Sequence, residues 1–139
     1  MTPRLSSKVA DAARVMGLPV TELAEAERKE FREQVRLAFA SECRFGELWD
    51  YASDGEALYL PRPWDALKSY PVVGPVVLFF EPDRDQVMLR FESLADAATS
   101  VEAVGKVEFA AVDIGCDWFV SYNHSEFLIL RGSAANWVT

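Results

Sequence analysis

The chain has 139 residues, of which half are apolar, and it carries 22 acidic against 14 basic residues, for a formal net charge of −8. This length suits one domain with a substantial core, and the apolar fraction lies well above that of disordered chains, so we expect a single α+β domain over residues 1–139. The acidic balance argues against nucleic acid or an anionic membrane as the main partner, because both are recognised through clustered Lys and Arg.

Cysteine usage and the N-terminal sequence indicate a cytoplasmic protein. Cys43 and Cys116 lie far apart in the sequence, each without a neighbouring cysteine, which fits neither a zinc site nor a disulfide framework. The N-terminus lacks the continuous apolar stretch of a signal peptide. The longest apolar run, at 71–80, is about half of the ~20 residues that a membrane span needs.

Two amphipathic helices are expected at the start of the chain. Apolar residues recur at helical spacing over 5–16, and the serines at 6–7 can cap this helix. A second helix is expected to begin at Thr21, a favourable N-cap, with an inner apolar stripe that ends at Phe39. Its outer face alternates in charge at i, i+4 spacing, as on a solvated helix.

The pattern weakens over residues 41–70. A Ser-Asp-Gly turn at 53–55 predicts a strand pair at 48–51 and 57–60. Pro63 then suits the first turn of a short helix.

The second half of the chain predicts an antiparallel sheet. The run at 76–81 is apolar on both sides, as in a central strand, and the segment at 86–92 alternates, so the two predict a hairpin. Ser93 caps a following helix, and a further alternating strand is expected at 106–114.

The last two predicted strands, at 117–122 and 126–131, flank a Tyr-Asn-His-Ser segment that has the composition of a hairpin turn. Together these elements predict an α+β fold, in which N-terminal helices pack on one face of a mainly antiparallel twisted sheet of about five strands.

His124 is the only histidine in the chain, and it lies in that predicted turn. One interpretation is an ordinary exposed turn residue. The other is that Tyr122, Asn123 and His124 line a ligand site or an active site. Asp117 is a poor partner for this histidine, because seven strand residues at ~3.3 Å each separate the two by about 20 Å.

No catalytic or cofactor motif accompanies the histidine. The sequence has no G-x-S-x-G nucleophile motif, no phosphate-binding glycine fingerprint and no calcium loop, so we expect no cofactor and no metal. Cys116 is close to His124 in sequence but is expected at the other end of the same strand. Four turn carboxylates are further acid–base candidates that nothing in the sequence distinguishes, namely Glu81, Asp83, Asp85 and Glu92.

Several aromatic residues fall where the helical and strand periodicity is weakest. They either fill the space between the sheet and the helices or lie at the surface, where aromatic side chains often anchor partners. Acidic residues surround the first of them, which would suit a basic protein surface. The candidate partner-binding residues are Trp49, Asp50, Tyr51, Asp54, Tyr59 and Trp64.

The C-terminal part of the chain carries the pattern W-[LF]-x-x-x-N-H followed by an apolar strand that closes on glycine, at Trp118, Phe119, Asn123, His124 and Gly132. With the order of elements over 5–132, this resembles a group of small uncharacterised bacterial α+β proteins of toxin-immunity type. Ser125 stands where that group often has a second histidine, so a histidine pair is not expected. The resemblance implies a fold and a setting rather than a reaction.

These observations lead to two main hypotheses. The leading one is a non-enzymatic, cytoplasmic, immunity-like protein that covers a basic partner, such as a toxin, through an acidic surface bearing aromatic residues. The alternative is a small ligand-binding domain or enzyme with its site around Tyr122, Asn123 and His124. An apolar cavity converging on His124 would favour the alternative. A homodimer formed through an exposed strand or the C-terminal segment is a third option.

Overall fold

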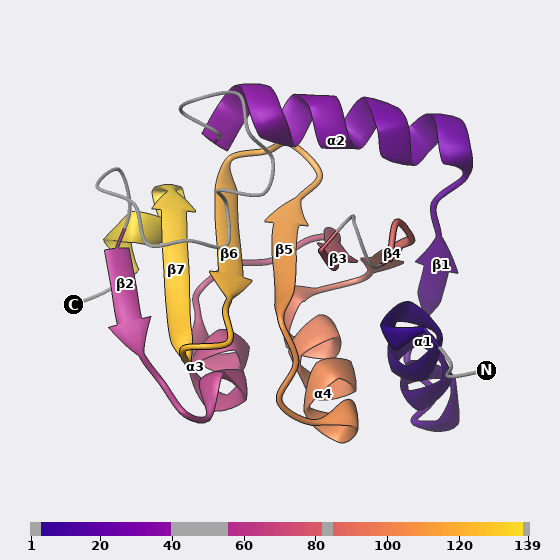
Figure 1. Cartoon of the computed structure of the whole chain (residues 1–139), viewed down its shortest axis with the longest axis horizontal. Coiled ribbons are helices and arrows are strands. Elements are labelled where there is room, and N and C mark those ends of the chain that lie inside the picture. Colours follow the sequence, from indigo (N-terminus) through magenta and orange to yellow (C-terminus); the bar gives the residue numbers. More distant parts are fainter. Residues whose placement is uncertain (1–3, 40–55, 82–84, 138–139) are drawn as a thin grey trace.

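The computed structural model describes residues 4–39, 56–81 and 85–137 of the chain. Within these residues a seven-stranded sheet forms the centre, in the order β1-β4-β3-β5-β6-β7-β2, and each neighbouring pair is antiparallel (Figure 1). The α+β class with an antiparallel sheet is confirmed, whereas the expected count of about five strands is wrong. The strands are β1 (Val20–Glu22), β2 (Glu56–Tyr59), β3 (Val76–Phe79), β4 (Met88–Phe91), β5 (Phe109–Asp113), β6 (Trp118–Tyr122) and β7 (Phe127–Gly132).

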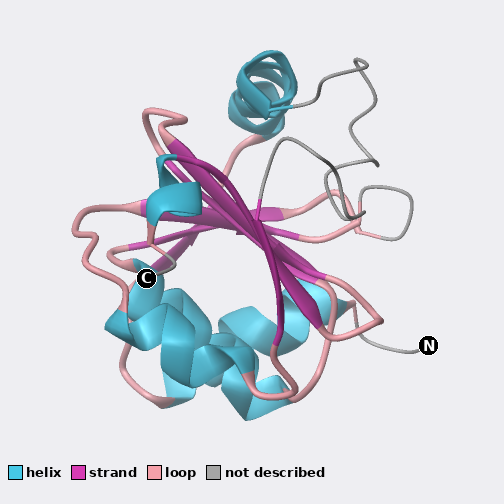
Figure 2. Ribbon diagram, turned by 90° about the vertical axis from the view of Figure 1, so that its left-hand side faces the viewer, coloured by secondary structure: helices cyan, strands magenta, loops and turns pink. Residues whose placement is uncertain are grey.

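Helices cover both faces of the sheet, not one face as expected. Figure 2 shows α2 on one side and the other three α-helices on the opposite side. The helices are α1 (Leu5–Val15), α2 (Glu25–Phe39), α3 (Pro63–Ser69), α4 (Leu94–Val104) and the short 3-10 helix η2 (Ser133–Asn136).

The central strand β3 explains why both faces need a cover. All four of its residues are buried. Leu78 belongs to the large core that α1, α3 and α4 cover, whereas Val77 and Phe79 belong to a smaller core beneath α2. Because successive strand residues point to opposite faces, a strand that is apolar throughout requires packing on both sides.

The two strands beyond the expected five lie at the two ends of the sheet. One of them, β2, corresponds to the strand predicted at 57–60, but its partner differs from the expected one. Val20–Glu22 pairs with β4, so α2 begins at Glu25 rather than at Thr21. The segment Glu56–Tyr59 pairs with β7, and the partner strand that we expected for it at 48–51 lies outside the described residues. Both are short edge strands whose pairing partner is remote in sequence.

The start of α1 is capped by a residue far along the chain. Neither serine hydroxyl caps this helix; instead Asp85 accepts a hydrogen bond from the Ser6 backbone N–H at 2.8 Å through one carboxylate oxygen and from the Val87 N–H at 3.1 Å through the other. A carboxylate at this position satisfies a free N–H group of the first turn and complements the helix dipole. In contrast, the predicted cap of α4 is confirmed, because Ser93 Oγ accepts from the Asp96 N–H at 3.1 Å.

Gly132 ends β7 where two parts of the chain approach closely. Its φ angle is +63°, and a Cβ atom at this position would lie 2.5 Å from the Asp117 carbonyl oxygen and 2.9 Å from the Phe39 ring. The residue therefore needs both the conformational freedom and the small size of glycine.

We expect Gly132→Ala to lower the free energy of unfolding by at least about 2 kcal/mol, because it combines a strained backbone with a steric overlap. Gly17→Ala is the matched control: its φ is +75°, but a Cβ there has no neighbour within 4 Å, so only about 1 kcal/mol of backbone strain is expected. Urea denaturation of both variants measures the difference. Equal losses would show that the close approach at Gly132 does not matter.

Candidate functional site

The turn between β6 and β7 is a hairpin, as the sequence predicted. Its geometry depends on Asn123, whose side-chain oxygen accepts hydrogen bonds from the Ser125 N–H at 3.0 Å and the Phe127 N–H at 3.1 Å. This arrangement satisfies the backbone of the turn from within. The Asn123 oxygen therefore has a structural role.

Tyr122 is also committed to the fold. Its ring is buried and stacks on Phe109 at a centroid distance of 5.9 Å, and its hydroxyl donates to the Leu60 carbonyl oxygen at 2.8 Å. Burial, with smaller contributions from Glu126 and Tyr59, raises the pKa of the Tyr122 hydroxyl above its ordinary value. Of the three residues expected at the alternative site, only His124 has an exposed side chain.

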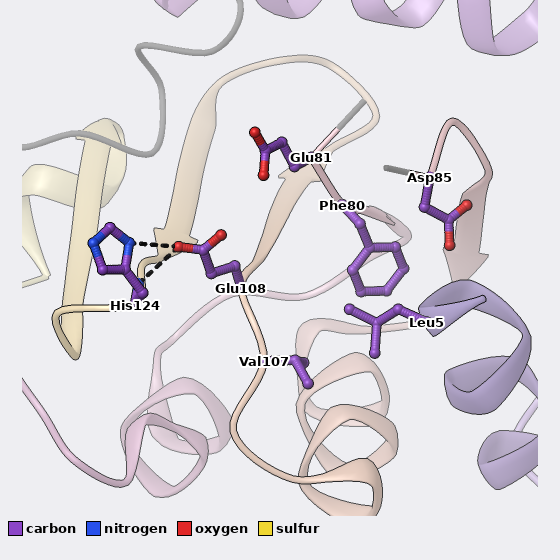
Figure 3. Close-up of a pocket in the computed structure, with 7 residues that line it drawn as sticks. All are labelled: Leu5, Phe80, Glu81, Asp85, Val107, Glu108 and His124. Carbon is purple, nitrogen blue, oxygen red and sulfur yellow. Dashed lines mark hydrogen bonds and ion pairs between the residues drawn. The ribbon is translucent and has the colours of Figure 1, made fainter. Parts of the chain in front are cut away.

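His124 forms a close pair with Glu108. The imidazole Nδ1 lies 2.9 Å from Glu108 Oε1, and the His124 backbone N–H donates to the same oxygen at 2.9 Å (Figure 3). The histidine side chain is 83% exposed, whereas that of Glu108 is 28% exposed. In the neutral imidazole, a proton on Nδ1 donates to Glu108 and leaves Nε2 as a hydrogen-bond acceptor.

Glu108 is not among the residues that the sequence singled out, although strand register carries a signal for it. Phe109 pairs with Tyr122 in the β5–β6 ladder, so the residue before Phe109 lies beside the turn that contains His124. At the other end of β6, Asp117 accepts a hydrogen bond from Ser133 Oγ at 2.8 Å. The expectation that Asp117 does not serve His124 is therefore consistent with the contacts of both residues.

The His124–Glu108 pair lies at one side of a pocket of about 480 Å³. Leu5 at the start of α1, Phe80 after β3 and Val107 before β5 supply apolar lining, and Figure 3 shows Leu5 and Phe80 facing each other. The described lining residues include three carboxylates and no Lys or Arg. They are Leu5, Phe80, Glu81, Asp85, Val107, Glu108 and His124.

Two of the four turn carboxylates singled out in the sequence, Glu81 and Asp85, thus line this pocket. Asp85 is only 6% exposed and holds the start of α1 in place. Glu92 is not among the described lining residues, and Asp83 lies outside the described part of the chain. The structure therefore places His124 beside a pocket whose carboxylates come from other parts of the chain.

Two of the six candidate partner-binding residues, Tyr59 and Trp64, lie in the described part of the chain. Trp49, Asp50, Tyr51 and Asp54 lie outside the described residues. Trp64 is 6% exposed and belongs to the large core, which is incompatible with an exposed anchor. Tyr59 is 61% exposed, with its ring edge-on to Phe127 at a centroid distance of 5.7 Å.

Cys116 is a poor nucleophile. It lies between β5 and β6, at the end of β6 opposite to His124. Partial burial and the nearby Asp113 carboxylate raise the pKa of its thiol to about 11, so the thiol is protonated at neutral pH. A Cys–His catalytic pair formed by these two residues is therefore contradicted.

The described part of the chain contains no group of three or more His, Cys, Asp or Glu side chains placed to hold a metal ion. None of the described helices has the length and apolarity to cross a membrane.

No match was found among protein-family models, curated proteins or solved structures. The toxin-immunity resemblance therefore stays a hypothesis.

We expect Cys116 to react slowly with iodoacetamide, with a rate that rises through pH 11 rather than near the ordinary value of 9.0. Because the shift is about two pKa units, the thiolate fraction at pH 8 is about 100-fold smaller than for a thiol of ordinary pKa. The measurement uses Cys43→Ser protein, which retains one thiol, and the same protein unfolded in urea as the control. A folded-state inflection near pH 8–9 would contradict the proposed burial effect.

Proposed function

We propose that the protein is a non-enzymatic recognition domain whose ligand occupies the pocket between His124 and Asp85. The main support is the form of that pocket, which combines an apolar lining with a few converging polar groups. Its volume of about 480 Å³ lies in the range of small-molecule sites, and such sites typically pair an apolar surface with a small number of orienting polar groups.

The chemistry of the surrounding groups favours binding over catalysis. The Tyr122 hydroxyl and the Asn123 side-chain oxygen form hydrogen bonds to the backbone, and the Cys116 thiol, at the far end of β6, is protonated. The described lining residues contain a candidate base in His124 but no hydroxyl or thiol that it could activate. An open imidazole beside a carboxylate is well suited to hydrogen bonding with a ligand.

An amide NMR titration tests this proposal with three six-carbon probes: n-hexylamine, n-hexanol and hexanoate. We expect at least one probe to bind with a Kd in the ~mM range, as suits so small a ligand, and to shift the amide signals of Phe80, Val107, Glu108 and His124. Val107→Trp should abolish these shifts because the indole fills the pocket. Val73→Trp adds the same bulk at a position that is 97% exposed and outside the lining, and it should retain them.

Two outcomes would refute a ligand site in this pocket. One is the absence of any localised shift with all three probes. The other is an identical response from Val107→Trp and the wild-type chain, because binding would then occur elsewhere.

A basic protein partner is the second candidate, and Tyr59 favours it. The ring projects from β2, the terminal strand of the described sheet, and Glu56 on the same strand is also exposed. Exposed tyrosine is a common interface anchor, and the net charge of −8 would accelerate encounter with a cationic surface. The immunity-like role belongs to this candidate.

A pull-down from the native host tests the second candidate. We expect the wild-type chain to capture a protein of high pI at 50 mM NaCl, with the yield falling several-fold at 500 mM NaCl because salt screens the attraction. Tyr59→Ser should also lose most of the captured protein, whereas Val73→Ser, at another exposed site, should not. Capture that withstands both high salt and Tyr59→Ser would count against this surface.

A further inference from the structure

We infer that the pocket beside His124 selects a small cationic ligand, an ammonium or guanidinium group on a short aliphatic stem. This inference rests on the proposed function, because it names the chemical class of the ligand that the same pocket would bind. It follows from which polar atoms of the lining are engaged, from the charge of the lining and from the position of the apolar side chains.

Glu108 offers an available carboxylate oxygen. Both of its hydrogen bonds, from the imidazole Nδ1 and from the backbone N–H of His124, go to Oε1. Oε2 has no hydrogen-bond partner among the described residues. His124 therefore holds the carboxylate in one orientation, and Oε2 can accept a charge-assisted hydrogen bond from an N–H group of a ligand.

The charge of the lining opposes an anion. Asp85 and Glu108 contribute carboxylates, without a Lys or Arg among the described lining residues. Lys106, next to the lining in sequence, directs its ammonium to Glu126 at 3.0 Å. The N-terminus of α1 also carries a partial positive charge, but the Asp85 carboxylate already accepts the Ser6 N–H there.

The apolar lining favours a ligand with an aliphatic stem over a bare ion. The pocket that the carboxylates line is also lined by Leu5, Phe80 and Val107. Leu5 and Val107 pack at the margin of the large core. Burial of a methylene group against such surface contributes about 0.8 kcal/mol. A cation with a stem would thus bind more tightly than a small inorganic cation.

The three-probe NMR titration decides the ligand class when it is carried out on the full chain at pH 7 and 150 mM NaCl. We expect n-hexylamine to bind in the pocket at least 10-fold more tightly than n-hexanol and hexanoate not to bind. Glu108→Gln should weaken hexylamine about 5- to 10-fold and leave hexanol unchanged, because it removes a charge while keeping the shape. Glu92→Gln removes the same charge at an exposed position outside the described lining, and it should change neither affinity.

The outcomes separate this inference from the proposed function. If no probe binds, the proposed function itself fails. If hexanol or hexanoate binds in the pocket as tightly as hexylamine, or if Glu108→Gln and Glu92→Gln behave alike, only the cationic class is overturned. Nα-acetyl-lysine methylamide, titrated in parallel, distinguishes the sources of the cation: binding equal to that of hexylamine assigns it to a lysine side chain, and much weaker binding assigns it to a free amine.

Discussion

Burial of the central strands on both faces is the constraint on which the arrangement of this protein depends. Since β3 presents apolar side chains in both directions, the chain must supply cover on two sides, and it does so with α2 on one face and α1, α3 and α4 on the other. The same strand positions the pocket. Phe79 pairs with Ala110, so continuing this register by two residues places Glu81 across from Glu108 at one end of the sheet. The pocket is thus a consequence of strand register rather than of any local motif.

Elements with local sequence signals were predictable. The Ser93 cap of α4, the hairpin of β6 and β7 and the first turn of α3 at Pro63 all depend on residues within a few positions of one another, and each is confirmed. The edge strand β1, the pairing of β2 with β7, the face that α2 covers and the Asp85 cap of α1 depend instead on partners dozens of residues away. Periodicity carries no information about such partners, which is why these features were missed.

The candidate site likewise combines features that have a local sequence signal with features that depend on remote partners. The sequence places His124 in a turn, but its sequence neighbours point inward or bond to the turn, and its actual partner, Glu108, directly precedes β5. The pattern that carried the family resemblance is similarly structural for the most part. Trp118 packs against Trp137 at a centroid distance of 5.1 Å, Asn123 shapes the turn, and Gly132 permits a close approach. Only His124 within that pattern remains open to a ligand.

Asp85 joins the pocket to the helix that borders it. One of its oxygens receives the Ser6 amide and the other the Val87 amide, so a single carboxylate tethers α1 to the segment that leads into β4. Neutralising that carboxylate would loosen two amide contacts at once, and hydrogen exchange at Ser6 and Val87 would accelerate together. By thermodynamic linkage, a molecule that binds in the pocket and changes the electrostatic environment of Asp85 would also change how often the first turn of α1 unfolds.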